Sequence, residues 1–332
     1  MRELFENKTV LVTGGTGSIG GEIVRQLLAY APRHVRIYSR DEYKQFQMRA
    51  ALADHPNLRF LLGDVRDLER LRRAVEGVHV IFHAAALKRV EACEYNPFEV
   101  VKTNVIGTEN VITAALESGV EKVVGISTDK AVSPTGTMGA TKLLAEKLMT
   151  WASFYRIEPK KTFLCVRFGN VLDSRGSVIP IFKKMIENGG PVVLHDDRMR
   201  RFVMSIPKAV GLVFKALSLA EGGEIFVLKM PVVRIRDLAE VLIEEYGPRC
   251  GRDPRDISLE VRGKNPGEKL DEELMTEEER SRCLVVDEYG VIISERRAKN
   301  YTFPQRVEGF TTQENLIGKE ELRELLRAEG LV

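Results

Sequence analysis

Short apolar runs alternate with amphipathic segments along the first half of the chain. The run Lys8–Thr13 is rich in β-branched residues, stops at Gly14 and leads into a segment with apolar residues at helical spacing. Buried parallel strands read as short, continuous apolar runs, and helices as apolar positions three or four residues apart. Further runs of the first kind are His34–Ser39, Leu58–Leu62, His79–His83, Lys122–Ile126 and Thr162–Arg167. The pattern therefore predicts an α/β fold with a Rossmann-type, doubly wound parallel sheet.

The alternation of strands and helices breaks after Arg167. Before that point, helices are predicted at Phe98–Ser118 and at Thr137–Tyr155. A start of the first helix at Asn96, with Pro97 at its first position, is the alternative. Later helices are predicted at Ile179–Asn188, Ser205–Ala220, Ile235–Tyr246, Glu272–Ser281 and Lys319–Ala328, and later strands at Pro191–Leu194, Glu224–Leu228 and Ile257–Val261. We therefore predict a nucleotide-binding core over residues 1–168. Residues 169–332 would form mainly a smaller mixed α/β substrate-binding domain with a C-terminal interface or latch, and some later segments could return to the core.

Composition and charge describe an ordinary globular protein. The chain of 332 residues has a net charge of +2, from 50 basic and 48 acidic residues, so nothing indicates a nucleic-acid or anionic-membrane partner. No apolar run approaches the ~20 residues that span a bilayer, and the charged start M-R-E-L-F-E-N-K does not resemble a signal peptide. We therefore expect a cytoplasmic protein. Four scattered cysteines without C-x-x-C spacing predict reduced thiols and no metal site.

A glycine-rich loop between the first predicted strand and helix indicates a dinucleotide site. The loop has the pattern T-G-x-x-G-x-x-G. In this context the glycines let the backbone approach a pyrophosphate closely at the helix N-terminus. The candidate contacts are Gly14, Thr16, Gly17, Ser18, Ile19 and Gly20.

The second predicted strand ends where a dinucleotide fold meets the adenosine ribose. An acidic residue there favours the 2′-hydroxyl of NAD, whereas a cation accommodates the 2′-phosphate of NADP. Ser39, Arg40 and Lys44 outnumber Asp41 at this point, so we predict NADP as the cofactor, with NAD as the less favoured alternative. A solvated charged loop is the other interpretation of these residues.

Three further segments carry candidate cofactor contacts. Asp64 and Val65 follow the third strand, where a carboxylate can meet the adenine amino group. The small residues after the fourth strand let the backbone pass close to a flat ligand, and they are Ala84, Ala85 and Ala86. Asn104 stands among apolar residues and is expected to be buried near the active strand, where a structural role is as open as a contact to the cofactor.

A cluster of proton-transferring side chains follows the fifth predicted strand. The stretch reads S-T-D-K-A-V-S-P-T-G-T-M-G-A-T-K, and ligands in such sheets bind beyond the carboxyl ends of the strands. Its Thr128, Asp129 and Lys130 can donate, accept or transfer protons. Met138 lies four residues before Lys142 on the same helical face, and a thioether does no proton chemistry near neutral pH. We expect these five residues to form the catalytic site, with one proton-transferring member replaced.

Several motifs together resemble the extended short-chain dehydrogenase/reductase superfamily. The chain carries T-G-G-T-G-S-I-G, Y-S-R-D-E, H-A-A-A-L-K, S-T-D-K-A, R-F-G-N-V-L and P-G-E-K-L. Within the superfamily it is most similar to the polysaccharide-biosynthesis type of nucleotide-sugar 4,6-dehydratase, which acts on UDP-N-acetylglucosamine, over about residues 5–290. The T-D-K triplet is the specific part, because dTDP-glucose and GDP-mannose dehydratases carry Asp-Glu at Asp129-Lys130.

The resemblance implies a UDP-sugar substrate and a redox-neutral cycle on a tightly held NADP. C4 of the sugar is oxidised, water is lost across C5 and C6, and the hydride returns to C6. On this interpretation Asp129 protonates the departing C6 hydroxyl, Lys130 removes the C5 proton, and Thr128 hydrogen-bonds O4. Lys142 holds the nicotinamide ribose and lowers the pKa of nearby donors.

The resemblance also implies substrate contacts in the second half of the chain. Arginine groups there could grip a diphosphate. The candidates are Asn170, Ser177, Val178, Arg201, Arg262 and Glu268, with Lys88 near the sugar. A homo-oligomer is expected, either a dimer or a larger ring. Whether the configuration at C5 is retained or inverted stays open.

Met138 departs from the superfamily pattern Y-x-x-x-K, in which the tyrosine takes the C4 hydroxyl proton. Some members of this dehydratase group also carry Met, and Thr128 with Asp129, or a water positioned by Lys142, must then assist hydride transfer.

Two alternative functions stay open. A 4-epimerase shares the fold and cofactor but has no need of an acid–base pair beside C5 and C6. A catalytically silent NADP(H)-binding sensor would explain the missing tyrosine, although Asp129, Lys130 and Lys142 are all retained.

Overall fold

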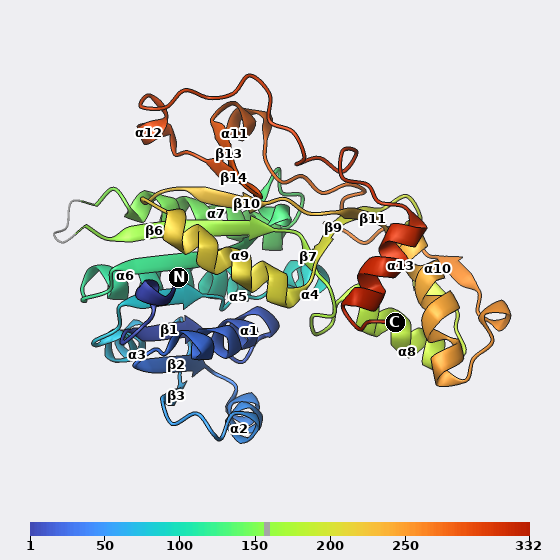
Figure 1. The fold of residues 1–332 in the computed structure, drawn as a ribbon, viewed down its shortest axis with the longest axis horizontal. Helices are drawn as coiled ribbons and strands as arrows, with labels where there is room; N and C mark the ends of the chain where they lie inside the picture. The colour runs from blue at the N-terminus through green and yellow to red at the C-terminus, as the bar shows by residue number, and fades with distance from the viewer. Residues whose placement is uncertain (156–159) are drawn as a thin grey trace.

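One large sheet organises the protein (Figure 1). The computed structural model describes residues 1–155 and 160–332, and within them nine strands join in the order β13-β14-β10-β6-β5-β4-β1-β2-β3. The strands from β3 to β10 run parallel, whereas β14 and β13 are antiparallel additions. The strands are β1 (Thr9–Thr13), β2 (His34–Ser39), β3 (Leu58–Leu62), β4 (Val80–His83), β5 (Lys122–Thr128), β6 (Thr162–Phe168), β10 (Ile225–Leu228), β13 (Cys283–Val286) and β14 (Tyr289–Ile292). This arrangement confirms the predicted Rossmann-type sheet.

The strand that leads into the catalytic cluster is longer than its sequence predicts. β5 runs past the predicted end at Ile126, because Ser127 and Thr128 pair with Arg167 and Phe168 of β6. The extra pairs carry Thr128 on the strand itself, at its carboxyl end. The backbone of Thr128 is therefore fixed by the sheet rather than by a loop.

Helices cover the sheet, with α1 (Ser18–Leu27) contacting α9 (Ile206–Leu219), and α6 (Gly107–Leu116) contacting α3 (Leu68–Val75) and α7 (Thr137–Ala152) (Figure 1). The shorter helices are α2 (Glu42–Ala51), α4 (Val90–Tyr95) and α5 (Pro97–Val100). The predicted start at Asn96 and Pro97 is confirmed. The predicted single helix is nevertheless interrupted, because residues Val101–Ile106 form a π-helical segment. Such segments are frequent at functional sites.

A second, smaller hydrophobic cluster lies beyond the large sheet, around α8 (Val178–Glu187), α10 (Ile235–Tyr246) and α13 (Lys319–Ala328) (Figure 1). Two short sheets accompany it, and they pair β8 (Val192–Leu194) with β12 (Leu259–Val261), and β9 (Arg200–Met204) with β7 (Asn170–Val171) and β11 (Val232–Arg234). β10, β13 and β14 belong to the large sheet, and α9 packs in its core, so later parts of the chain contribute to both the large sheet and the smaller hydrophobic cluster. The domain boundary at residue 168 stays a prediction.

The predicted helix Glu272–Ser281 is wrong in its first half, since α11 covers only Glu277–Ser281. The preceding segment lies along β9 instead. The N–H of Arg200 donates to the carbonyl of Leu270 at 3.0 Å, and the Arg200 guanidinium pairs with Asp271. These long-range contacts fix the backbone immediately before Glu272, and α11 begins only after its N-cap Thr276.

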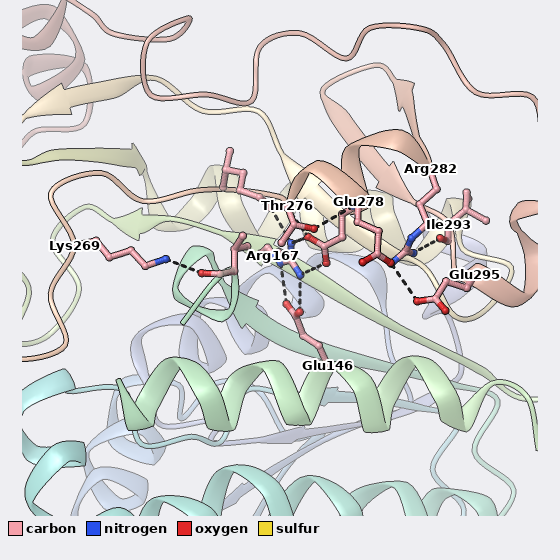
Figure 2. Close-up of polar contacts among 11 residues, drawn as sticks. Glu146, Arg167, Lys269, Thr276, Glu278, Arg282, Ile293 and Glu295 are labelled. Carbon is pink, nitrogen blue, oxygen red and sulfur yellow. Dashed lines mark hydrogen bonds and ion pairs between the residues drawn. The ribbon is translucent and has the colours of Figure 1, made fainter. Parts of the chain in front are cut away.

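A buried ion-pair network fastens α11 to the sheet (Figure 2). Arg167 on β6 is 0% exposed, and its guanidinium donates to Glu146 on α7 at 2.6 and 3.0 Å. It also donates to both carboxylate oxygens of Glu279 on α11 at 3.0 Å and to the carbonyl of Leu274 at 2.8 Å. An unpaired buried charge is costly, so this network holds β6, α7 and α11 in one arrangement beneath the site.

Candidate active site

The glycine-rich loop between β1 and α1 packs too closely for a side chain at two positions. Gly14 has a φ of 65°, and a Cβ there would lie 2.8 Å from the Cα of Ala85. A Cβ on Gly20 would collide with the carbonyl oxygen of Gly14. Glycine at both positions therefore lets α1 begin directly behind the loop, with its first N–H groups beside a cleft.

That cleft gathers most of the predicted cofactor contacts from the ends of neighbouring strands. Its lining comprises Gly14, Thr16, Gly17, Tyr38, Ser39, Arg40, Asp41, Lys44, Gly63, Asp64, Val65, Ala84, Ala85, Ala86, Leu87, Thr103 and Arg175. Ser18, Ile19 and Gly20 adjoin it as the first residues of α1. The cleft fits a dinucleotide whose pyrophosphate lies at the N-terminus of α1.

Cations and carboxylates meet at the end of β2. The hydroxyls of Thr16 and Ser39 share a hydrogen bond of 2.8 Å. Lys44 pairs with Asp41, and hydrogen bonds from Lys44 lower the pKa of the Asp41 carboxyl. The guanidinium of Arg40 lies 3.5 Å from the carboxylate of Asp64. Both cations predicted to favour a 2′-phosphate thus line the cleft, each beside an acid, and NADP over NAD stays a prediction.

Arg175 is a cleft residue that sequence reasoning missed. It lies in the loop between β7 and α8, and its N–H donates to the hydroxyl of Ser18 at 3.2 Å. Its guanidinium also donates to the carbonyl of Thr16. Arg175 therefore connects the loop between β7 and α8 to the glycine-rich loop. The available signal was an arginine within the polar, glycine-containing stretch after β6.

Asn104 holds the backbone next to the cleft. Its Oδ1 accepts from the N–H of Leu87 at 2.8 Å, and its Nδ2 donates to the carbonyl of Leu87 at 3.0 Å and to the hydroxyl of Thr141 at 3.1 Å. These bonds link the turn after β4 to the π-helical segment and to α7. They favour the structural role over a direct contact, and the cofactor contact stays a prediction.

The T-D-K triplet forms a connected cluster at the carboxyl end of β5. The hydroxyl of Thr128 donates to Asp129 Oδ1 at 2.9 Å, and Lys130 Nζ donates to the same oxygen at 2.9 Å. Lys130 also lies 3.3 Å from Asn170 Oδ1 and 3.6 Å from Glu272 Oε1. Asp129 is fully buried, and its Oδ2 has no hydrogen-bond partner among the described residues. A proton donor and a proton acceptor are thus in direct contact.

The pKa values of the two lysines of the site are shifted in opposite directions. Burial acts to lower the pKa of Lys130, but the charges of Asp129 and Glu272 raise it on balance. Burial lowers the pKa of Lys142, whose Nζ donates to the carbonyl of Ile126 at 2.6 Å. Lys142 is therefore held against β5, one residue before the extension that carries Ser127 and Thr128.

Met138 packs as an apolar side chain. It is buried in a small cluster with Cys93 and Val100. It also lines a narrow cavity together with Lys130 and Glu272. The position that carries a tyrosine in the Y-x-x-x-K pattern therefore contributes packing and no proton donor.

The predicted substrate residues divide into two groups, and their role in substrate binding stays a prediction. The first group lies near the triplet and the start of α8. Asn170 contacts Lys130, and Lys88 Nζ lies 3.4 Å from the hydroxyl of Ser174. Ser177 occupies the N-cap position of α8, whose first residue is Val178, but its buried hydroxyl has no hydrogen-bond partner in the described parts of the chain.

The second group lies along the segment that follows β12. Arg201 donates to the carbonyls of Arg200, Leu270 and Lys269 at 2.7–2.9 Å, so its guanidinium supports the protein backbone. The side chain of Arg262 is 66% exposed. Glu268 accepts from the N–H of Asn265 at 2.9 Å and lies 2.9 Å from His195 Nδ1. Arg201 is thus occupied by backbone contacts, whereas Arg262 is exposed and lies 3.6 Å from Glu260.

A dinucleotide cleft beside a buried acid–base cluster, on this sheet, defines the nucleotide-sugar dehydratase and epimerase class of the short-chain dehydrogenase/reductase superfamily. Residues 10–294 match the family described as polysaccharide biosynthesis protein. The chain belongs to this family, which confirms the resemblance predicted from the motifs.

Relatives of the chain carry two different activity names. A UDP-N-acetylglucosamine 4,6-dehydratase (inverting) of Campylobacter jejuni is 41% identical over 291 residues, which are 87% of this chain and 84% of that protein. A UDP-glucose 4-epimerase of Rickettsia conorii is 42% identical over 305 residues, or 90% and 86%. A protein of Methanocaldococcus jannaschii described as an uncharacterized membrane protein is 57% identical over 275 residues, or 83% and 82%.

Two solved structures share the fold. Pen from Bacillus thuringiensis superposes with a TM-score of 0.92 at 42% identity, over 98% of both chains. DesIV, a dTDP-glucose 4,6-dehydratase from Streptomyces venezuelae solved with NAD, gives a TM-score of 0.70 at 26% identity, over 79% of this chain and 86% of that chain. The likeness to Pen therefore includes the smaller hydrophobic cluster as well as the large sheet.

Membrane-spanning helices and metal sites were considered for residues 1–155 and 160–332. None of the helices in these ranges has both the length and the apolar character that a membrane crossing requires. Within the same ranges, no three His, Cys, Asp or Glu side chains are grouped as metal ligands. The cytoplasmic location stays a prediction.

Proposed function

We propose that the protein is a UDP-N-acetylglucosamine 4,6-dehydratase that forms a UDP-4-keto-6-deoxy-hexosamine. The observation that carries the proposal is the contact of 2.9 Å between Asp129 and Lys130 at the end of β5. Elimination across C5 and C6 needs an acid for the leaving hydroxyl and a base for the C5 proton on adjacent carbons. This pair supplies both, and the Campylobacter relative is named for this activity.

The cofactor would be a nicotinamide dinucleotide, and we favour NADP over NAD. Ser39, Arg40 and Lys44 line the cleft with the hydroxyl and cationic groups that suit a 2′-phosphate. When bound, the cofactor would take up the C4 hydride and give it back at C6. The N-terminus of α1 would bind its pyrophosphate, and Lys142 would hold the nicotinamide ribose.

The chain's own groups would move the protons. Thr128 donates to Asp129, so its hydroxyl can pass the C4 hydroxyl proton to the carboxylate. Asp129 then gives that proton to the C6 hydroxyl, which leaves as water. Lys130 takes the C5 proton and returns a proton to the same carbon. Met138 has no part in these transfers.

A 4-epimerase is the second candidate, because the Rickettsia relative carries that name at a similar identity. Epimerisation inverts C4 alone, so it requires no acid and base at C5 and C6, which is the role proposed for Asp129 and Lys130. A silent NADP(H)-binding sensor is the third candidate, and the apolar packing of Met138 favours it. Neither explains why the acid and base are both retained in contact.

The product distinguishes these candidates. Purified protein is incubated with UDP-N-acetylglucosamine, and the product is analysed by mass spectrometry. A dehydratase gives a product lighter by one water, and an epimerase gives an isomer of the substrate. Unchanged substrate despite bound NADP(H) would support the sensor and contradict the dehydratase.

We also propose a cytoplasmic homo-oligomer. Apolar side chains are exposed along α4, α5 and α7, with Tyr95 82%, Phe98 81% and Trp151 50% exposed. Exposed apolar side chains of this size are suited to contact with a second copy. Light scattering should give a mass of at least two chains, and a monomer at micromolar concentration would contradict the proposal.

A further inference from the structure

Glu272 is a buried carboxylate beside the site to which the scheme above assigns no role. It is 4% exposed, and its Oε1 lies 3.6 Å from Lys130 Nζ. Its Oε2 is also buried and accepts no hydrogen bond within the described residues. Burying a carboxylate costs free energy unless the carboxylate pairs with a nearby cation. We propose that Glu272 is a positioning residue that holds Lys130 opposite Asp129 and makes it a stronger base, an inference that rests on the proposed function.

Lys130 lies between two carboxylates. Asp129 Oδ1 lies 2.9 Å from its Nζ and Glu272 Oε1 lies 3.6 Å from it, while Asn170 adds a neutral oxygen and Arg201 is the opposing positive charge. The carboxylates stabilise the ammonium that forms when Lys130 takes the C5 proton. Once Lys130 is a neutral amine, stabilisation of the ammonium that it forms increases the driving force for taking the proton from carbon. Glu272 therefore supports proton removal without touching the sugar.

The segment that carries Glu272 is fastened at several points. Arg201 donates to the carbonyls of Lys269 and Leu270, and Arg200 pairs with Asp271. The Lys269 ammonium donates to the carbonyl of Val132 at 2.7 Å, a bond that Figure 2 shows. These contacts fix the backbone immediately before Glu272. These contacts therefore hold the Glu272 carboxylate close to Lys130.

Met138, which stands where the Y-x-x-x-K pattern has tyrosine, affects the interaction between Glu272 and Lys130. Met138 and Glu272 line the same narrow cavity as Lys130. A thioether donates no hydrogen bond to the carboxylate, and an apolar wall strengthens charge interactions nearby. Among the described residues, Lys130 is the cation within 4.0 Å of Glu272. The carboxylate therefore acts on Lys130.

Glu272→Gln tests the proposal, because it removes the charge and keeps the shape. The matched control is Glu273→Gln, which makes the same change at the exposed neighbouring residue. We expect kcat at the alkaline plateau to fall roughly tenfold or more, with KM for the UDP-sugar changed by less than about twofold. Losing the carboxylate lowers the pKa of Lys130, so the acidic limb of the kcat profile should move to lower pH. Glu272→Asp keeps the charge and should recover part of the rate.

A titration separates this inference from the proposed function. NMR of isotopically labelled lysine follows the Lys130 ammonium in the folded protein without substrate. The pKa of Lys130 should be lower in Glu272→Gln than in wild type and unchanged in Glu273→Gln. Equal pKa values, or an unchanged kcat profile, would overturn the proposal. If wild-type protein fails to dehydrate the sugar, the proposed function falls, and the titration alone decides whether Glu272 sets the basicity of Lys130.

If Glu272→Gln fails to fold, Glu272→Asp takes its place. A Lys130 pKa equal to wild type despite the shorter carboxylate would again overturn the proposal.

Discussion

Asp129 and Lys130 are adjacent in the sequence, and their side chains also meet, with Nζ 2.9 Å from Oδ1. The two partners differ in exposure, since Asp129 is fully buried whereas the side chain of Lys130 is 24% exposed. The carboxylate is thus shielded while the ammonium reaches the cavity. This contact joins the proposed acid to the proposed base and is the basis of the predictions for the chemistry.

Asp129→Asn should abolish most of the turnover. The amide cannot protonate the leaving C6 hydroxyl, so kcat should fall roughly 10²–10⁴-fold while NADP(H) stays bound. Steady-state kinetics with UDP-N-acetylglucosamine measures the effect, with the exposed Asp287→Asn as control. Turnover at the wild-type rate would remove Asp129 from the mechanism.

Met138→Leu should leave catalysis almost intact. The side chain is buried among Cys93 and Val100, and leucine preserves its apolar volume. We expect kcat within about threefold of wild type, since the side chain supplies packing only. A loss of two orders of magnitude with an unchanged fold would show that the thioether has a specific role.

Arg40→Ala combined with Lys44→Ala should change the cofactor preference. Each cation would contribute a charge-assisted bond to a 2′-phosphate and none to a 2′-hydroxyl. The Kd for NADP should rise roughly tenfold or more while the Kd for NAD changes little. The control is Arg73→Ala, which removes an exposed cation on α3. Equal weakening of both cofactors would contradict the NADP assignment.

Glu146→Gln should destabilise the whole fold. It leaves the buried guanidinium of Arg167 with only part of its counter-charge. Breaking a buried ion pair costs about 3–5 kcal/mol, so the unfolding midpoint in denaturant should fall clearly. Glu117→Gln, which breaks an exposed pair with Arg72, should leave the midpoint near wild type. Equal midpoints for the two variants would contradict this view of the network.

His83 should stay neutral in the folded protein at pH values where exposed histidines are charged. Its ring lies between the hydroxyls of Thr13 and Thr108, and burial lowers its pKa to about 3. Between that value and the ordinary pKa of about 6.5, the unfolded chain binds the extra proton. This residue therefore costs stability as the pH falls below about 6.5. An NMR signal of His83 that titrates near pH 6 would contradict the prediction.

Local patterns were sufficient to predict the large sheet and the positions of the candidate site residues. The β-branched runs, the glycine spacing and the T-D-K triplet each lie within a few residues, so the sheet, the cleft and the Asp129–Lys130 pair could be read from the sequence. Contacts between distant segments could not be predicted in this way. The Arg201 guanidinium donates to the carbonyl of Leu270, and its contact to a diphosphate stays a prediction. Glu272 lies outside the helix predicted for it, with its carboxylate 3.6 Å from Lys130. Neither contact has a signal within a window of neighbouring residues.

The central claim is that Asp129 and Lys130 carry out an elimination across C5 and C6. The most direct measurement is NMR of the product formed from UDP-N-acetylglucosamine in deuterated water. The account predicts a 4-keto-6-deoxy sugar with solvent deuterium at C5, and with the former C4 hydrogen at C6. A product that differs from the substrate only in its configuration at C4, with protium retained at C5, would contradict it.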